Sequence, residues 1–188
     1  MKLVQKACIV VLTVQGATPF IRAHEPSMHP SQGSSAPTAQ EKQRSADETR
    51  KRLEQLACGP SGAHFSHHTE EGPQALPEQP PDKGLIYVIR TRSGGFQSKL
   101  SMDGKWVGVN RGTNYFYIEA DPGPHYFCVK TGFDTPGLLS LVIEKGKIYY
   151  LHQNFTMGGE ELDLLDEAKG KEYVAKYHRS VFEVKSKK

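Results

Sequence analysis

Long apolar runs are missing from this chain of 188 residues. A membrane-spanning helix needs about 20 consecutive, mostly apolar residues. The longest apolar stretch near the N-terminus, Ala7–Val14, has only about eight, and no later run is long enough. The chain is therefore expected not to span a membrane.

A concentration of positive charge is missing as well. The chain carries 24 lysines and arginines against 21 acidic residues, a net charge of +3, and the two signs are scattered among each other. Proteins that bind nucleic acid usually gather their basic residues on one face or in one segment. Nucleic acid is therefore not an expected partner.

The short motifs that mark common classes of enzyme are also missing. No serine lies in a G-x-S-x-G turn, and no glycine-rich phosphate loop precedes an expected helix. The acidic residues within Glu160–Glu167 follow one another on one segment, whereas glycoside hydrolysis needs two carboxylates that face each other across a cleft. We therefore expect a protein with no catalytic activity and no cofactor.

The N-terminal segment has the pattern of a secretory signal peptide. Lys2 and Lys6 give it positive charge, Ala7–Val14 is a short apolar core, and small residues offer cleavage sites after Ala17 or Ala23. A buried N-terminal strand is the alternative. We expect residues 1–23 to be removed and the mature protein to be soluble, in the periplasm or outside the cell.

Cysteines are few, and their positions are informative. Cys8 lies in the expected signal peptide, so Cys58 and Cys128 are the two that stay in the mature chain. Two cysteines in an exported protein are expected to pair where the geometry permits. The sequence therefore predicts a disulfide between Cys58 and Cys128, with two unpaired buried thiols as the alternative.

The amino-acid composition changes twice between residue 24 and residue 83. Residues 24–40 are rich in proline, serine, glycine and alanine, and are expected to be disordered. Residues 41–59 have high helix propensity and a narrow apolar stripe, with Gly59 as the expected C-cap. Residues 60–83 are expected to form an extended linker.

From residue 84 onward the hydrophobic pattern predicts strands. The run GLIYVIRT is largely apolar and rich in β-branched residues. Turn signals such as Asp103-Gly104 recur about every ten residues, which is typical of an antiparallel sandwich or barrel. We therefore predict a mainly β fold for residues 84–188: a single small antiparallel β-sandwich of immunoglobulin-like or transthyretin-like type. A short helix that Asp166 caps is expected near its C-terminal end.

The order of these segments resembles a bacterial family of exported proteins, the domain of unknown function numbered two-eight-four-six. The family has a strand, a D-G-x-x-V-G hairpin, an aromatic Y-F strand, a P-G-x-H turn and an A-G-K-x-Y-Y hairpin. Here they correspond to GLIYVIR, DGKWVG, NYFYIEA, PGPH and GKIYY. The resemblance covers residues 80–175. It implies a small exported β-sandwich and no catalytic residues, and the chain lacks the well-placed lipidation cysteine of many relatives.

Histidines form one group of candidate site residues. His64, His67 and His68 lie close together in the sequence, and three imidazoles can hold zinc or copper. Cleavage after Ala23 would expose His24, whose amine and imidazole make a copper chelate. The alternative is that the first three histidines belong to a polar loop, because no carboxylate or second cysteine completes a standard ligand spacing.

Aromatic residues form the other group. Trp106, Tyr115 and Tyr117 are the leading candidates for a flat face on which a sugar or a peptide stacks. Further candidates for the same face are Tyr126, Tyr149 and Tyr150. The alternative is that these rings fill the core and cover the exposed face of the sandwich. Trp106 follows Lys105 at an expected hairpin, so it is the ring expected to be most exposed.

These observations together predict an exported, non-catalytic β-sandwich module that binds an envelope protein or a glycan, or that supports the envelope structurally. The alternative function is a periplasmic or secreted protein that binds copper or zinc through the histidines.

Overall fold

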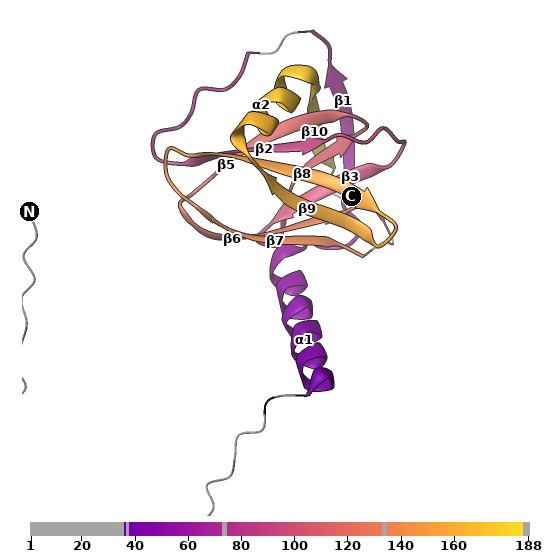
Figure 1. The fold of residues 1–188 in the computed structure, drawn as a ribbon. Helices are drawn as coiled ribbons and strands as arrows, with labels where there is room; N and C mark the ends of the chain where they lie inside the picture. Colours follow the sequence, from indigo (N-terminus) through magenta and orange to yellow (C-terminus); the bar gives the residue numbers. More distant parts are fainter. Residues whose placement is uncertain (1–35, 37, 73–74, 133–134, 186–188) are drawn as a thin grey trace, which may run out of the picture. The chain divides into compact units, whose positions relative to one another are not determined.

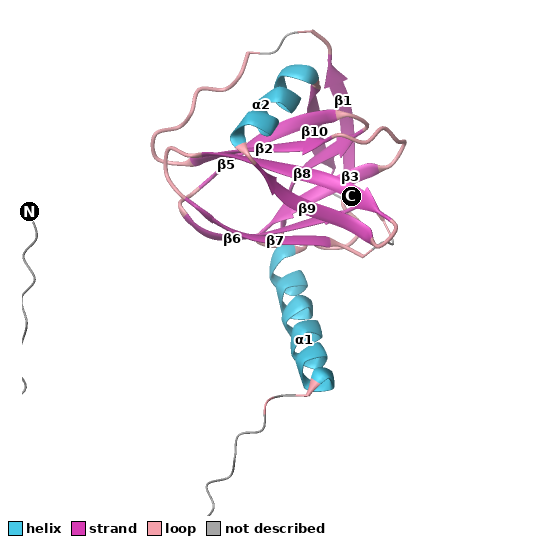
Figure 2. Ribbon diagram, in the orientation of Figure 1, coloured by secondary structure: helices cyan, strands magenta, loops and turns pink. Residues whose placement is uncertain are grey.

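The computed structural model describes residues 36, 38–72, 75–132 and 135–185. The expected signal peptide (residues 1–23) and most of the expected disordered segment (24–40) lie outside these residues. Within the described chain there are ten strands, in two sheets, and two helices (Figures 1 and 2). The predicted mainly β fold, with a helix before the sandwich and a short helix near its end, is confirmed.

One sheet has six strands and the other has four. The six-stranded sheet runs in the order β1 (His64–Glu70), β10 (His178–Lys185), β5 (Asn114–Ala120), β2 (Gly84–Arg90), β8 (Ile148–Thr156) and β9 (Gly159–Leu165). The four-stranded sheet runs in the order β4 (Lys105–Arg111), β3 (Gln97–Met102), β6 (Gly123–Lys130) and β7 (Gly137–Ile143). Neighbouring strands are antiparallel except in two pairs, β2–β8 and β10–β5, which are parallel.

Turn chemistry predicts where the chain reverses but not which strands pair. Asp103 and Gly104 both have positive φ (50° and 75°), as a two-residue hairpin turn of type I′ requires, and they join β3 to its neighbour β4. Lys145-Gly146 is also a tight turn, but it joins β7 to β8, which lie in different sheets. The chain passes from one sheet to the other at this turn. Burial of apolar side chains, and not the turn, determines which strands pair.

The main core fills the space between the two sheets. Its buried members include Ile86 and Val88 of β2, Phe116 of β5 and Phe127 of β6. The other side chains of β2, which are Leu85, Tyr87 and Ile89, face the opposite way and pack under α2. β2 is therefore buried on both faces, and this explains its nearly continuous apolar sequence.

The helix α2 (Glu167–Lys176) covers the outer face of the six-stranded sheet (Figure 2). The side chain of Asp166 caps it, since one carboxylate oxygen accepts a hydrogen bond from the amide of Lys169 at 2.8 Å. Gly170 lies directly on the ring of Tyr150: a Cβ at this position would be 2.1 Å from Cγ of the ring. The absence of a side chain thus lets the helix backbone rest on the sheet.

The helix α1 (Ala39–Ala57) is attached to the four-stranded sheet at its C-terminal end. Cys58, which follows the helix, forms a disulfide with Cys128 of β6, as predicted. The hydroxyl of Ser101 on β3 donates a hydrogen bond to the carbonyl of Ala57 at 2.8 Å. Ala57 is the one buried residue of α1, so the disulfide joins an otherwise exposed helix to the sandwich.

Gly59 does not act as the predicted helix C-cap. The cap is Cys58, whose backbone is extended. A Cβ at Gly59 would lie 2.7 Å from the indole of Trp106. A glycine is therefore required at this position because the Trp106 ring packs against the backbone.

The expected linker over residues 60–83 contains a strand. β1 pairs antiparallel with β10 over its whole length and forms an edge of the six-stranded sheet. Phe65 is its one buried side chain, so the segment has too few apolar residues to be recognised as a strand. Among the described residues, no helix has both the length and the apolar character needed to cross a bilayer.

Candidate functional site

A hollow of about 780 Å³ lies under α2, on the outer face of the six-stranded sheet. Its floor is formed by Tyr87, Tyr115 and Tyr150. Its walls and rim include Leu76, Pro77, Ile148, Val174, Lys171, Lys176 and His178. We refer to this hollow as the tyrosine groove.

The strand register brings the tyrosines together. β2 lies between β5 and β8, and Tyr87 is directly opposite Tyr117 on one side and Tyr150 on the other. The rings of Tyr87 and Tyr150 are stacked, with centroids 5.4 Å apart and an interplanar angle of 11°. The ring of Tyr115 lies 6.0 Å from that of Tyr87. Three neighbouring strands thus build one aromatic cluster.

The floor tyrosines are buried, but their hydroxyls are not sealed. Tyr87, Tyr115 and Tyr150 are only 2–4% exposed. None of their hydroxyls has a hydrogen-bond partner among the described residues, yet none is among the polar atoms that are closed off from solvent. Because these residues line the hollow, their free hydroxyls open onto it, where water or a ligand can complete the hydrogen bonds.

Burial keeps these hydroxyls protonated. Desolvation is the largest cause that raises the pKa of Tyr87 to about 12, and the neighbouring tyrosines raise it in the same direction. Desolvation also raises the pKa of Tyr115 and that of Tyr150, although Arg179 and Lys171 respectively act in the opposite direction. At neutral pH the groove therefore offers three neutral hydroxyls, each able to donate and to accept a hydrogen bond.

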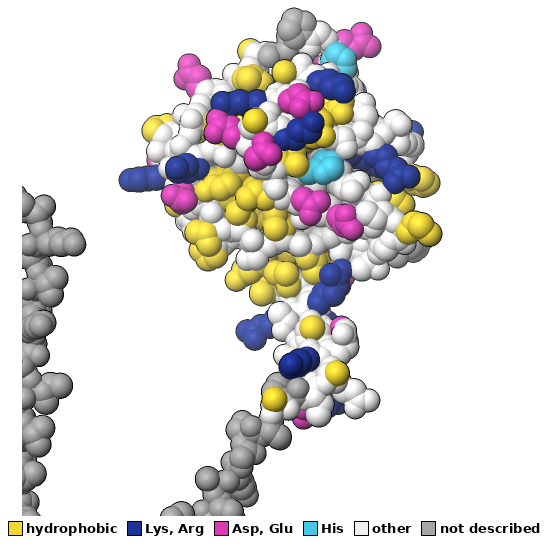
Figure 3. Space-filling model, viewed as in Figure 1, with side chains coloured by type: hydrophobic (Ala, Val, Ile, Leu, Met, Phe, Trp, Pro, Cys, Tyr) yellow, Lys and Arg dark blue, Asp and Glu magenta, His cyan; other side chains and the backbone are white. Residues whose placement is uncertain are grey.

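Charges of both signs surround the groove. Figure 3 shows acidic and basic side chains side by side over α2. Lys171 is paired with Glu167 on the same helix. At one end, Arg179 pairs with Glu70 at 2.7 Å and donates a hydrogen bond to the hydroxyl of Tyr117 at 3.1 Å. This rim is mixed in sign and has no strong preference for anions.

The structure separates the three aromatic residues that the sequence singled out. Tyr115 lies in the floor of the groove, and Tyr117 lies beside it. Trp106 is on β4, in the other sheet. Its ring meets Phe65 edge-on at 6.3 Å, and its Nε1 donates a hydrogen bond to the carbonyl of Pro60 at 2.9 Å. Trp106 therefore secures the chain between α1 and β1, and the predicted common face with the tyrosines does not form.

Sequence reasoning missed Tyr87 as a site residue, whereas it included Tyr150 among the further aromatic candidates. Tyr87 lies in an apolar run that predicts a core strand. Both residues point outward with Tyr115, and α2 closes the space above them. The alternation of tyrosines with apolar residues in β5 was the available sequence signal for an outward-facing aromatic cluster. It does not predict that α2 lies over this face of the sheet.

The histidines of β1 are not brought together. Successive side chains of a strand point to opposite faces, so His67 points away from His64 and His68, and these two are about 13 Å apart along the strand. Among the described residues, no group of three or more histidine, cysteine, aspartate or glutamate side chains is placed to hold a metal. His24 lies outside the described chain. The expected polar loop is also wrong, since the segment is a strand.

Two other histidines make close polar contacts. His125 uses both ring nitrogens: Nδ1 lies 2.6 Å from Asp103 Oδ2, and Nε2 lies 2.7 Å from the carbonyl of Asp121. No ring nitrogen is therefore left to act on a substrate. His152 Nε2 lies 2.8 Å from the hydroxyl of Thr91, but neither residue lines the tyrosine groove.

No model of a protein family, no curated protein and no solved structure matches this chain. The resemblance of residues 80–175 to the exported bacterial family stays a prediction.

Proposed function

We propose that the chain is an exported, non-catalytic β-sandwich module that binds a polyhydroxylated ligand, such as a glycan of the cell envelope, in the tyrosine groove. One observation carries this proposal. Three neutral tyrosine hydroxyls from adjacent strands open onto a single hollow and have no partner among the described residues.

The chemistry of the groove suits a sugar. Sugar hydroxyls donate and accept hydrogen bonds, as the three phenol groups do. The apolar walls formed by Leu76, Ile148 and Val174 suit the C–H surfaces of a sugar ring. The volume is within the range of small-molecule sites. Because Tyr87 and Tyr150 stack on each other, the hydroxyls and not the ring faces would contact the ligand.

The absence of catalysis is supported by the protonation state of the floor. A general base works best when its pKa is near the working pH, whereas burial raises the pKa of all three tyrosines. Export is supported by the disulfide, by the signal-like N-terminal sequence and by the family resemblance.

A panel of neutral and acidic oligosaccharides, screened by saturation-transfer NMR and quantified by calorimetry, tests the proposal. The variant Tyr87→Phe/Tyr115→Phe/Tyr150→Phe keeps the rings and removes the hydroxyls. Each lost hydrogen bond is expected to weaken binding about five- to tenfold. Tyr126→Phe, on the four-stranded sheet, is the matched control and should bind normally. Absence of binding to the whole panel, or equal binding by the triple variant, would refute the proposal.

A further inference from the structure

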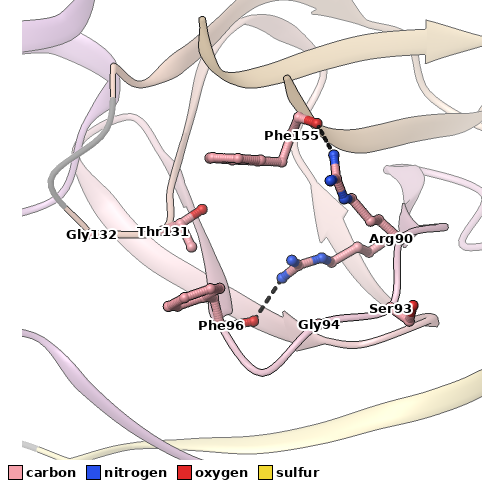
Figure 4. Close-up of a pocket in the computed structure, with 8 residues that line it drawn as sticks. Arg90, Ser93, Gly94, Phe96, Thr131, Gly132 and Phe155 are labelled. Atoms are coloured by element: carbon pink, nitrogen blue, oxygen red, sulfur yellow. Dashed lines mark hydrogen bonds between the residues drawn. The ribbon is translucent and has the colours of Figure 1, made fainter. Parts of the chain in front are cut away.

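We infer that the chain has a second ligand site, which takes an organic carboxylate bearing an apolar group, at the end of the sandwich where β2 finishes. A hollow of about 550 Å³ lies there, lined by Arg90, Arg92, Phe96, Thr131 and Phe155 together with Ser93, Gly94 and Gly132. In Figure 4, Arg90 extends into this hollow towards the side on which Phe96, Thr131 and Phe155 lie. We refer to it as the arginine pocket.

Arg90 is the central observation. Its side chain faces the interior between the sheets and is only 5% exposed. Its Nη1 donates a hydrogen bond to the carbonyl of Phe96 at 2.8 Å, and among the described residues it makes no other hydrogen bond and no ion pair. An arginine has five N–H donors, so most of them are left for the pocket.

The charge of Glu160 on β9 acts on Arg90. The pKa of Arg90 is lowered: burial is the main cause, the charge of Glu160 acts in the opposite direction, and that of Arg92 lowers it further. Glu160 is itself buried and accepts a hydrogen bond from Ser98 at 3.3 Å. A guanidinium stays charged in proteins. Among the described residues no acid forms an ion pair with Arg90, and a buried charge without a contacting counter-ion is costly. A bound anion would remove that cost.

A second guanidinium lines the same pocket. Arg92 donates from Nη1 to the carbonyl of Phe155 at 2.7 Å, and its guanidinium lies 5.7 Å from the centre of the Phe155 ring. Thr131 also lines the pocket, but its hydroxyl is closed off from solvent and is not available to a ligand. Two guanidinium groups thus converge on one hollow.

The rest of the lining favours a carboxylate over an inorganic anion. The planar fork of a guanidinium matches the two oxygens of a carboxylate. Phe96 is 73% exposed and Phe155 is partly exposed, so an apolar group attached to the carboxylate would cover these rings. Phosphate or sulfate would leave the rings uncovered.

The arginine pocket is separate from the tyrosine groove. Tyr87 and Arg90 lie on the same strand at odd and even positions, so they point to opposite faces of the sheet. The inference therefore does not depend on the proposed glycan binding. Loss of binding in one site should leave binding in the other unchanged.

The test uses 3-phenylpropionate as the probe, with 3-phenylpropanamide as its neutral counterpart and inorganic phosphate as the simple anion. We expect 3-phenylpropionate to bind and to shift the amide NMR signals of Gly94, Phe96 and Thr131. The neutral amide should bind at least tenfold more weakly, and phosphate should not displace the carboxylate. Equal binding of the amide would overturn the charge-based site, and equal binding of phosphate would overturn the assignment to carboxylates.

Variants connect the binding to the two arginines. Arg92→Gln changes an exposed residue and should weaken binding at least fivefold without affecting the fold. Arg90→Met, which keeps the buried volume, should abolish it. Arg52→Gln, an exposed change on α1, is the control, and the triple tyrosine variant should bind 3-phenylpropionate normally. No binding by the natural chain, or unchanged binding in Arg92→Gln, would refute the inference.

Discussion

At the scale of single residues, long-range contacts decide between roles that the sequence leaves open. His125 is on β6 and reaches the Asp103-Gly104 turn, where Asp103 accepts hydrogen bonds from both the His125 ring and the amide of Tyr126. One carboxylate therefore holds the tip of the β3–β4 hairpin against β6. The contact joins residues that are 22 and 23 positions apart.

This contact predicts a pH dependence. Burial lowers the pKa of His125, but its hydrogen bonds to Asp103 and Asp121 and their charges outweigh this effect, and the net pKa is raised. A raised pKa in the folded state means that the stabilisation is fully present below about pH 6.5 and is lost as the pH rises through the folded pKa. The free energy of unfolding, measured in urea at several pH values, should contain this decrease, and His125→Gln should lack it.

The difference between the variant and the natural chain isolates His125. Burial lowers the pKa of His67 and of His152, and these two histidines destabilise the fold as the pH falls, which is the opposite trend. Their contribution is the same in both proteins. If the two pH profiles are parallel, the His125–Asp103 contact does not stabilise the protonated ring.

At the scale of secondary-structure elements, close approach determines how α2 lies on the sheet. Val174 and Gly170 are its buried residues. The backbone at Gly170 contacts the Tyr150 ring near Cβ and Cγ, where the ring has little room to move. The same contact places α2 over the tyrosine groove, so the stability of the helix and the shape of the groove depend on one glycine.

We predict that Gly170→Ala destabilises the protein. Alanine favours the helix by about 1 kcal/mol relative to glycine. Overpacking a tight contact costs about 1–3 kcal/mol, and a Cβ 2.1 Å from the ring belongs at the upper end. The net loss should be about 1–2 kcal/mol by chemical denaturation.

The matched control is Gly95→Ala, in a loop where a Cβ would meet no atom within 4 Å. It should change the free energy of unfolding by less than about 0.5 kcal/mol. A Gly170→Ala variant that is more stable than the natural chain would contradict the prediction. It would mean that the gain in helix propensity exceeds the cost of overpacking and that α2 does not rest tightly on Tyr150.

At the scale of the whole molecule, the described chain from Thr38 onward stacks the four-stranded sheet, the six-stranded sheet and α2 in layers, and α1 projects from the four-stranded sheet (Figure 1). The two sheets share a core, and α2 shares a second apolar cluster with the larger sheet. α1 has no comparable apolar contact. It is held by the disulfide, by the Glu54–Lys130 ion pair at 3.0 Å and by the hydrogen bond from Arg50 to the carbonyl of Pro136 at 2.8 Å.

We predict that the disulfide stabilises the sandwich and α1 to different extents. It joins residues separated by 70 positions, for which the chain-entropy model gives about 4 kcal/mol. In the variant Cys58→Ala/Cys128→Ala, α1 should lose its amide protection against hydrogen exchange, because a lone helix of this length is marginal in water. β2 should stay protected, with the global free energy of unfolding about 2–4 kcal/mol lower.

The control for this variant is the natural protein with its disulfide intact, measured by hydrogen-exchange mass spectrometry under the same conditions. Retained protection of α1 would show that its ion pair and hydrogen bonds are sufficient to hold it. Equal loss of protection in α1 and β2 would show that the helix and the sandwich unfold as one unit.

Short-range patterns in the sequence predicted much of the fold. In β5 the sequence alternates Tyr115 and Tyr117 with Phe116 and Ile118, and the structure places the two pairs on opposite faces, with the second pair in the main core. The Asp103-Gly104 pair predicted a two-residue hairpin turn, and Asp166 predicted the start of α2. These features depend on residues within a few positions of one another, where propensity and periodicity act directly.

The edge strand β1 could not be predicted in this way. Its pairing with β10 joins segments about a hundred residues apart, and its single buried residue, Phe65, is a weak local signal. Such a strand exists because its backbone groups complete the sheet, and not because its own side chains bury enough apolar area.

The sequence by itself determined the β-rich class, the turns, the capped helix and the Cys58–Cys128 pair, because each follows from local conformational preference or from simple counting. Only the tertiary structure decided the sheet membership of each strand, the grouping of Tyr87, Tyr115 and Tyr150, and the placement of Arg90 in a hollow where no acid of the described residues contacts it. Those arrangements depend on which distant segments lie side by side, and burial of the core as a whole selects them.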